Sequence, residues 1–225
     1  MLDLLSGDII WRIFRYLDVG SRARLAAVNT TFYRLFNKWE DLLHCSVRLD
    51  GITLAGENFV IERKLVTPVF DRCPLIRKLA VHDERVLWKV DREVLRSLVN
   101  INELHISSNF FAEGSSDATI AALFSFPRLQ VLHIQQRYSE EKCQLNIVRP
   151  HHVLEIASAS LSDLKLQGVV VTAQALELIC SKYRNTLESL CLLGGLVSTS
   201  DLHRCFQAIS KCSESTHQLM AHFRT

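Results

Sequence analysis

The stretches INELHI, residues 101–106, and LQVLHI, residues 129–134, decide the fold of this chain. Each has apolar residues at its first, fourth and sixth positions. Side chains two positions apart on a β-strand point to the same face, so the fourth and sixth residues predict a short strand with one buried face. The first residue lies on the turn that enters the strand.

The same spacing occurs five times between residues 75 and 212. The cores are centred on Leu79, Leu104, Leu132, Leu164 and Leu190, at intervals of 25, 28, 32 and 26 residues. A repeat of this length with an L-x-x-L-x-L core is the sequence signature of a leucine-rich repeat, whose strands stack into one parallel sheet. An ordinary doubly wound α/β fold is the alternative, and the short, regular spacing disfavours it.

The segments that link the cores predict helices on the convex side of this solenoid, because each has apolar residues on one helical face. These faces comprise Val94, Leu95, Leu98 and Val99; Ile120, Leu123 and Phe124; Val153, Leu154, Ile156 and Ala157; Leu176, Leu178, Ile179 and Tyr183; and Leu202, Cys205, Phe206 and Ile209.

Residues between the core positions are expected to face the concave side, where solenoids commonly bind partners. One predicted row is Ala80, His105, His133, Lys165 and Cys191. The longest interval, after Leu132, predicts a loop that could carry partner-binding residues. We therefore take six residues as candidates for contacting a partner: His105, His133, Gln135, Arg137, Tyr138 and Lys165.

His105 and His133 fall at equal positions of neighbouring predicted strands, so a shared metal ion is one alternative for this pair. A structural zinc site requires four ligands, and no matching Cys or carboxylate pair completes the set. The pattern favours two solvated histidines, and we predict neither a metal nor another cofactor.

The N-terminal segment predicts a helix with a wide apolar face. Ile9, Ile13 and Leu17 follow one another at steps of four, and Ile10 and Phe14 form a second row. Two further short helices are expected before residue 37, with Leu25 and Val28 on the first of them. Three short helices cannot bury this apolar surface among themselves, so a second domain or a partner must cover part of it.

This segment resembles an F-box over about residues 4–37. The resemblance rests on Leu5-Ser6, Asp8-Ile9-Ile10, Ile13-Phe14, Tyr16-Leu17-Asp18, Leu25, Val28 and Phe32-Tyr33-Arg34-Leu35, which follow the order of the family pattern. Ser6 stands where the family usually has Pro, Arg22 where it has Leu, and Asn29 where it has Cys or Ser. Of these departures, we expect Arg22 to lower the affinity for the partner most, because it removes an apolar contact.

The repeats are similar to those of F-box proteins with leucine-rich repeats. Together the two resemblances imply an α/β chain in which a three-helix F-box precedes a solenoid of short parallel strands with helices on the convex side. The expected parts are an F-box at 1–40, a linker and first irregular repeat at 41–74, leucine-rich repeats at 75–212 and a polar C-terminal tail at 213–225.

The family resemblance implies a substrate-recognition subunit of an SCF (Skp-cullin-F-box) ubiquitin ligase. The F-box would bind the Skp adaptor, and through it a cullin and a RING subunit, while the repeats would hold a protein substrate. The implied adaptor-binding residues are Leu5, Ser6, Ile9, Ile10, Ile13, Phe14, Leu17, Leu25 and Val28. Some of them face the adaptor and others the helix core, and the sequence does not sort them.

Composition agrees with a non-catalytic intracellular protein. The net charge of +2 calls for neither nucleic acid nor an anionic membrane, and the seven scattered cysteines favour reduced thiols. There is no Gly-rich phosphate loop, G-x-S-x-G or H-E-x-x-H, so we do not expect an enzyme. We expect the protein in the cytoplasm, with the nucleus as a further site.

Two alternatives to the ligase subunit are a leucine-rich-repeat scaffold whose N-terminal helices only cap the solenoid, and a metal-dependent hydrolase that uses His105 and His133. The first is physically reasonable because the open end of a solenoid needs a cap. The sequence disfavours the second. It does not identify the substrate, a modification needed for its recognition, or whether the chain is a complete protein.

Overall fold

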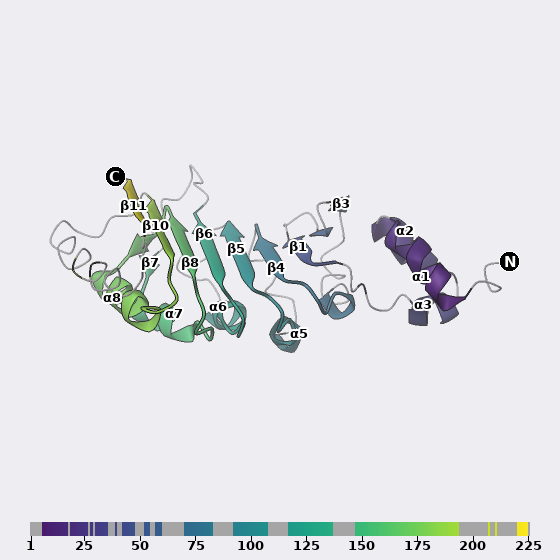
Figure 1. The fold of residues 1–225 in the computed structure, drawn as a ribbon, viewed down its shortest axis with the longest axis horizontal. Helices are drawn as coiled ribbons and strands as arrows, with labels where there is room; N and C mark the ends of the chain where they lie inside the picture. Colours follow the sequence, from purple (N-terminus) through teal and green to yellow (C-terminus); the bar gives the residue numbers. More distant parts are fainter. Residues whose placement is uncertain are drawn as a thin grey trace.

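The computed structural model describes residues 6–17, 19–26, 28, 30–35, 39, 42–47, 52–54, 57–59, 70–82, 92–107, 117–136, 147–193, 207, 210 and 220–224. In this part of the chain, a long sheet carries helices along one face, and three further helices lie beyond its N-terminal end (Figure 1). The expected α/β class, with a parallel sheet, is confirmed.

The main sheet has nine strands in the order β11-β10-β8-β6-β5-β4-β1-β2-β3 among the described residues. Its strands are β1 (His44–Val47), β2 (Ile52–Leu54), β3 (Glu57–Phe59), β4 (Lys78–Val81), β5 (Glu103–Ser107), β6 (Val131–Gln135), β8 (Asp163–Gln167), β10 (Ser189–Leu193) and β11 (Met220–Arg224). In the spatial order of the sheet, every pairing between β11 and β1 is parallel. The two remaining pairings, β1 with β2 and β2 with β3, are antiparallel.

The apolar core positions lie where the sequence pattern puts them. Leu104 and Ile106 of β5 are buried, and so are Leu132 and Ile134 of β6. The first residue of each core lies two positions before its strand and is also buried, as for Ile101. Leu192 is the one partly exposed member of the five predicted cores. Each strand thus turns one apolar face to the core.

A repeated backbone contact joins neighbouring strands where they begin. The carbonyl oxygen of Asn102 accepts hydrogen bonds from the N–H groups of Gln130 and Val131, at 2.8 and 2.9 Å. The same double contact occurs at four further carbonyls, those of Leu43, Arg77, Gln130 and Ser162. Because the turn before each strand is fixed to the preceding turn, the register of the whole sheet is the same from β1 to β10.

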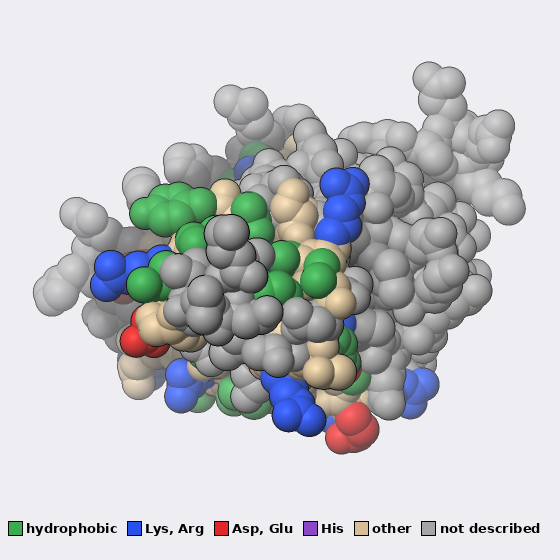
Figure 2. All heavy atoms as spheres, turned by 90° about the vertical axis from the view of Figure 1, so that its right-hand side faces the viewer, with side chains coloured by type: hydrophobic (Ala, Val, Ile, Leu, Met, Phe, Trp, Pro, Cys, Tyr) green, Lys and Arg blue, Asp and Glu red, His purple; other side chains and the backbone are tan. Residues whose placement is uncertain are grey.

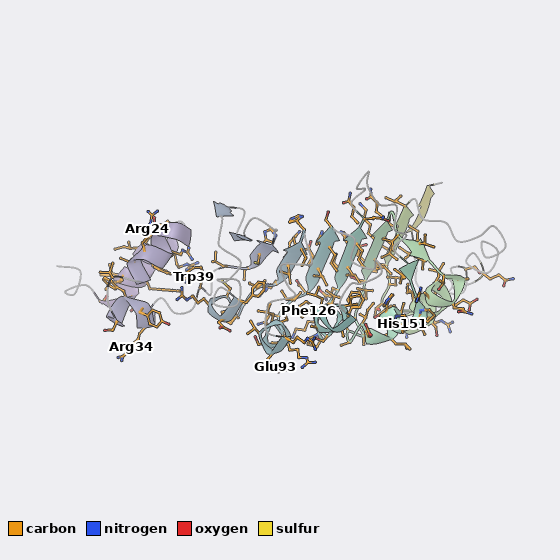
Figure 3. All side chains as sticks on the ribbon, turned by 180° about the vertical axis from the view of Figure 1, so that it is seen from behind. Arg24, Arg34, Trp39, Glu93, Phe126 and His151 are labelled. Atoms are coloured by element: carbon orange, nitrogen blue, oxygen red, sulfur yellow. The ribbon has the colours of Figure 1, made fainter. Side chains whose placement is uncertain are left out.

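Four helices cover one face of the sheet: α5 (Arg92–Ser97), α6 (Asp117–Phe124), α7 (Pro150–Glu155) and α8 (Ala173–Lys182) (Figure 1). They bury most of the predicted apolar positions, but Val99, Leu154 and Ala157 are exposed. Phe126, buried just after α6, lies between this helix layer and the sheet (Figure 3). The predicted helix around Leu202–Ile209 falls largely outside the described residues.

The N-terminal helices are α1 (Gly7–Arg15), α2 (Val19–Ala26) and α3 (Thr30–Leu35). Phe14 of α1 and Phe32 of α3 are buried among them. Trp39 lies between these helices and the sheet (Figure 3), and its backbone N–H donates to the backbone carbonyl oxygen of Arg72 at 2.5 Å. The buried residues of the helices and of the sheet form one continuous core cluster.

Several strands were not predicted. The segment expected as a linker and first irregular repeat, residues 41–74, contains the strands β1, β2 and β3. Two short strands, β7 (Ile147–Val148) and β9 (Val170–Val171), pair with each other beside the main sheet. Part of the expected polar tail forms β11, which pairs with β10.

Candidate functional site

The face of the sheet turned away from α5–α8, here called the open face, carries the polar residues of the strands. The strand pairing places His105 opposite His133, and His133 opposite Lys165, as predicted for one row. It also places Glu103 opposite Lys78. These side chains are half-buried, because they alternate along each strand with the leucines and isoleucines of the core.

Ion pairs and hydrogen bonds link the open-face side chains across four strands. Glu103 Oε1 lies 2.6 Å from Lys78 Nζ and 2.5 Å from His105 Nε2. His133 Nε2 lies 2.9 Å from Asp163 Oδ2, and the rings of His105 and His133 meet edge to face with centroids 4.6 Å apart. Both carboxylates of this cluster are therefore already engaged by groups of the chain itself.

This environment shifts the acid–base properties of three groups. Burial lowers the pKa of His105, although its hydrogen bond to Glu103 opposes that change. Burial would raise the pKa of Glu103, but the hydrogen bonds from Lys78 and His105 outweigh it and lower the value. Burial and the neighbouring Lys78 lower the pKa of His44. A pKa below 6.5 leaves the His44 and His105 rings mainly neutral at pH 7.

A groove of about 420 Å³ runs over this cluster. Polar side chains from β1, β4, β6 and β8 line it, among them His44, Lys78, His133, Gln135 and Lys165. The Nε2 atom of His44 is buried in the structure without a hydrogen-bond partner. The groove therefore combines an unsatisfied polar atom with charged and amide side chains.

A second cavity, of about 400 Å³, lies at the edge of the sheet where the strands begin, here called the entry edge. Arg77, Asn102, Arg128 and Gln130 line it. Arg128 donates a hydrogen bond to Asn100 at 3.1 Å. This cavity is separate from the open-face groove, with which it shares no lining residue.

The structure sorts the predicted residues of α1 into two faces. Ile10 and Phe14 are buried in the core. Ile9, Ile13 and Tyr16 remain 47%, 44% and 91% exposed, and their spacing places them along one side of the helix. Figure 2 looks onto this end of the molecule, where apolar side chains lie among Lys and Arg side chains. The three residues, here called the outer stripe, form an apolar surface on the described chain.

The remaining N-terminal candidates differ in exposure. Val28 is exposed, whereas Leu17 and Leu25 are partly buried against the core. Ser6 is exposed and precedes α1 without a capping hydrogen bond from its side chain. Leu5 lies outside the described residues, as do the loop candidates Arg137 and Tyr138.

Arg22, which we expect to weaken the affinity for the adaptor, is packed within the N-terminal helices. It is only 4% exposed, and its guanidinium lies 5.2 Å from the centre of the Phe14 ring. The guanidinium also donates to the carbonyl oxygens of Leu17, at 2.9 Å, and Arg15, at 2.8 Å. Arg22 therefore packs on α1 and satisfies carbonyls that the end of the helix leaves free.

His44 is the groove residue that sequence reasoning missed. It was missed because β1 has Cys45 and Val47 where the other cores have larger aliphatic residues. The pattern Leu42-x-x-Cys45-x-Val47 keeps the spacing of the five predicted cores, and Leu42 and Cys45 are buried. A search that allowed Cys at the central position would have placed His44 beside Lys78.

Within the described residues, no group of three or more His, Cys, Asp or Glu side chains is placed to hold a metal ion. The described helices also include none with the length and apolar character needed to cross a membrane.

No protein-family model matches this chain, and no curated protein matches it.

Proposed function

We propose that this chain is the substrate-recognition subunit of an SCF-type ubiquitin ligase, with an N-terminal F-box and a leucine-rich-repeat solenoid. The outer stripe of α1 carries the proposal. Its three large apolar side chains are exposed to solvent, whereas the other face of the helix is buried. An apolar stripe of this kind on a small helical unit suits a permanent protein partner.

In this proposal the outer stripe binds the Skp adaptor, and the adaptor links the chain to a cullin and a RING subunit. The open face holds a protein substrate near the ubiquitin-charged enzyme. The chain itself performs no chemistry: it raises the local concentration of substrate lysines at the reactive thioester. The proposed location is the cytoplasm, and the nucleus is a further site.

The test is capture of a purified Skp adaptor by the wild-type chain and by an Ile9→Ser/Ile13→Ser variant. Each substitution removes apolar surface that the complex would bury, at about 1.5 kcal/mol or more per side chain. The double variant should therefore bind about 100-fold more weakly. Its free energy of unfolding should change little, because neither side chain belongs to the buried core.

A matched control is Leu154→Ser, which removes an apolar side chain that is 65% exposed on α7. This variant should bind the adaptor as the wild type does. If the folded wild type does not bind the adaptor, the ligase proposal is wrong. The scaffold alternative, in which α1–α3 only cap the sheet, would then be favoured by the continuous core that joins them to it.

A further inference from the structure

We propose that the open-face groove binds an acidic, extended segment of the partner protein, whose Asp or Glu side chains meet the unengaged cations and donors of the groove. This inference rests on the proposed function, because it names the class of substrate that the open face would hold. It follows from which polar groups of the face are already paired and which are not.

The carboxylates Glu103 and Asp163, which are bonded to residues that line the groove, are already paired. Glu103 is paired with both Lys78 and His105, and Asp163 is paired with His133. Each carboxylate accepts from a histidine Nε2, so that atom carries a hydrogen. A basic segment would have to displace these internal partners before it could bind a carboxylate of the face.

The free groups, in contrast, are cationic or can donate. Among the described residues, none forms an ion pair or hydrogen bond with the side chain of Lys165, which lines the groove. His44 also lines the groove, and its buried Nε2 has no hydrogen-bond partner. An incoming carboxylate can pair with Lys165 at one end of the groove and lie beside the His44 ring at the other. The unused capacity of the groove is therefore complementary to negative charge.

The positions of these two residues suggest the length of the segment. Lys165 is on β8 and His44 is on β1, and β4, β5 and β6 lie between these strands. Four strand spacings amount to roughly 19 Å. An extended chain covers that distance in about six residues. We therefore expect acidic side chains about six residues apart to contact the two ends of the groove.

Histidine protonation adds a pH dependence. The groups that face His105 and His133 are Glu103 on β5, Lys78 on β4, His44 on β1, and Asp163 and Lys165 on β8, with His82 after β4 also in the groove. Because His105 Nε2 already carries a hydrogen, a further proton on this ring goes to Nδ1 and turns an acceptor into a charged donor. Acidification should therefore strengthen the binding of an acidic segment.

The experiment measures binding of two fluorescein-labelled peptides to the full chain by fluorescence anisotropy. One peptide alternates Glu with Ala and Ser, and the other replaces each Glu by Lys. The Glu peptide should bind and the Lys peptide should not. The affinity of the Glu peptide should rise by about 10-fold when the pH is lowered from about 7.5 to about 5.5, a range in which Glu remains ionised. A His105→Gln variant should lose most of this rise.

Lys165→Glu should weaken binding of the Glu peptide by about 5- to 10-fold. Arg128→Glu, at the entry edge, makes the same charge change outside the groove and should have no effect. If Arg128→Glu weakens binding and Lys165→Glu does not, the acidic segment binds at the entry edge and the proposal is wrong.

The proposal is also wrong if the wild-type chain binds neither peptide or prefers the Lys peptide. Adaptor capture, measured on the same preparations, separates this failure from a failure of the proposed function. A chain that captures the adaptor but binds no Glu peptide is a ligase subunit with another class of substrate. Lys165→Glu should capture the adaptor as the wild type does, because Lys165 lies on the sheet and the outer stripe lies on α1.

Discussion

At the scale of single residues, Arg22 shows how one side chain can take over the packing of an apolar residue. Its guanidinium stacks on Phe14 and donates to two carbonyls at the end of α1. An apolar side chain at this position could pack on Phe14 but could not bind the carbonyls. Arg22 therefore provides both the packing and the helix cap in the N-terminal unit.

We predict that Arg22→Ala lowers the free energy of unfolding by about 3 kcal/mol. The substitution removes two charge-assisted hydrogen bonds and the stacking on Phe14, and it leaves helix-end carbonyls without these partners. Chemical denaturation checks the value. Arg24→Ala is the control, since Arg24 is exposed on the same helix and points away from the helix bundle (Figure 3). Equal effects of the two variants would contradict this role of Arg22.

The Glu103–His105 contact makes a second prediction at this scale. The pKa of His105 is lowered in the fold, so the unfolded state binds more protons just below pH 6.5. Stability should therefore fall as the pH drops through this range. Glu103→Gln removes the carboxylate that partly offsets the burial of His105, so the pKa of His105 should fall further.

Titration of the His105 ring resonances by NMR measures this pKa directly. The lowered pKa of Glu103 adds a separate contribution to stability, which is present above about pH 4.3 and is lost as the pH falls through the folded-state value. Glu93→Gln on α5 is the control, because Glu93 pairs with Arg96 away from the open face. A His105 pKa above 6.5, or one that Glu103→Gln leaves unchanged, would contradict the contact.

At the scale of elements, α1 is the clearest case of one helix with two apolar faces of different use. We predict that Phe14→Ala lowers the free energy of unfolding by about 3 to 5 kcal/mol, because Phe14 is fully buried. Ile13→Ala should cost much less, because Ile13 is 44% exposed. Thermal denaturation compares the two. A large loss of stability for Ile13→Ala would mean that the outer stripe is part of the core.

The sequence predicted the five central strands, their register and the helices between them, because each repeat buries its own leucines in the same way. It could not sort the two faces of α1, since Ile9 and Ile10 are the same residue type and only the packing of neighbouring elements decides which of them is covered. It missed β2, β3 and β11, whose residues do not repeat the leucine pattern. Short edge strands of this kind depend on the neighbour with which they pair.

For the candidate site, the row of His105, His133 and Lys165 could be predicted, because strand alternation and equal register suffice to place side chains opposite one another. The ion pairs could not be predicted. Glu103 binds Lys78 and His105, whereas Asp163 binds His133, and these pairings depend on the rotamers of side chains on neighbouring strands. Which groups remain unpaired, and hence which charge the groove attracts, therefore required the structure.

At the scale of the whole molecule, the sheet is a line of units in which each strand pairs with its neighbours. The repeated carbonyl contacts at the entry edge join each unit to the preceding one. In such an arrangement the free energy of unfolding is approximately a sum of contributions from the individual units and from the interfaces between neighbouring units. A change at one end should therefore weaken the adjacent strand and leave distant strands nearly unaffected.

Removal of residues 217–225 tests this expectation, because it deletes β11 and leaves β10 as the edge strand. The amides of β10 that pair with β11 should then exchange with solvent faster, and those of β8 should change less. The amides of β4 and β5, several strands away, are the internal control and should keep their exchange rates. Equal acceleration from β4 to β10 would mean that the sheet unfolds as one cooperative unit, and the strands that carry the open-face groove would then depend on β11.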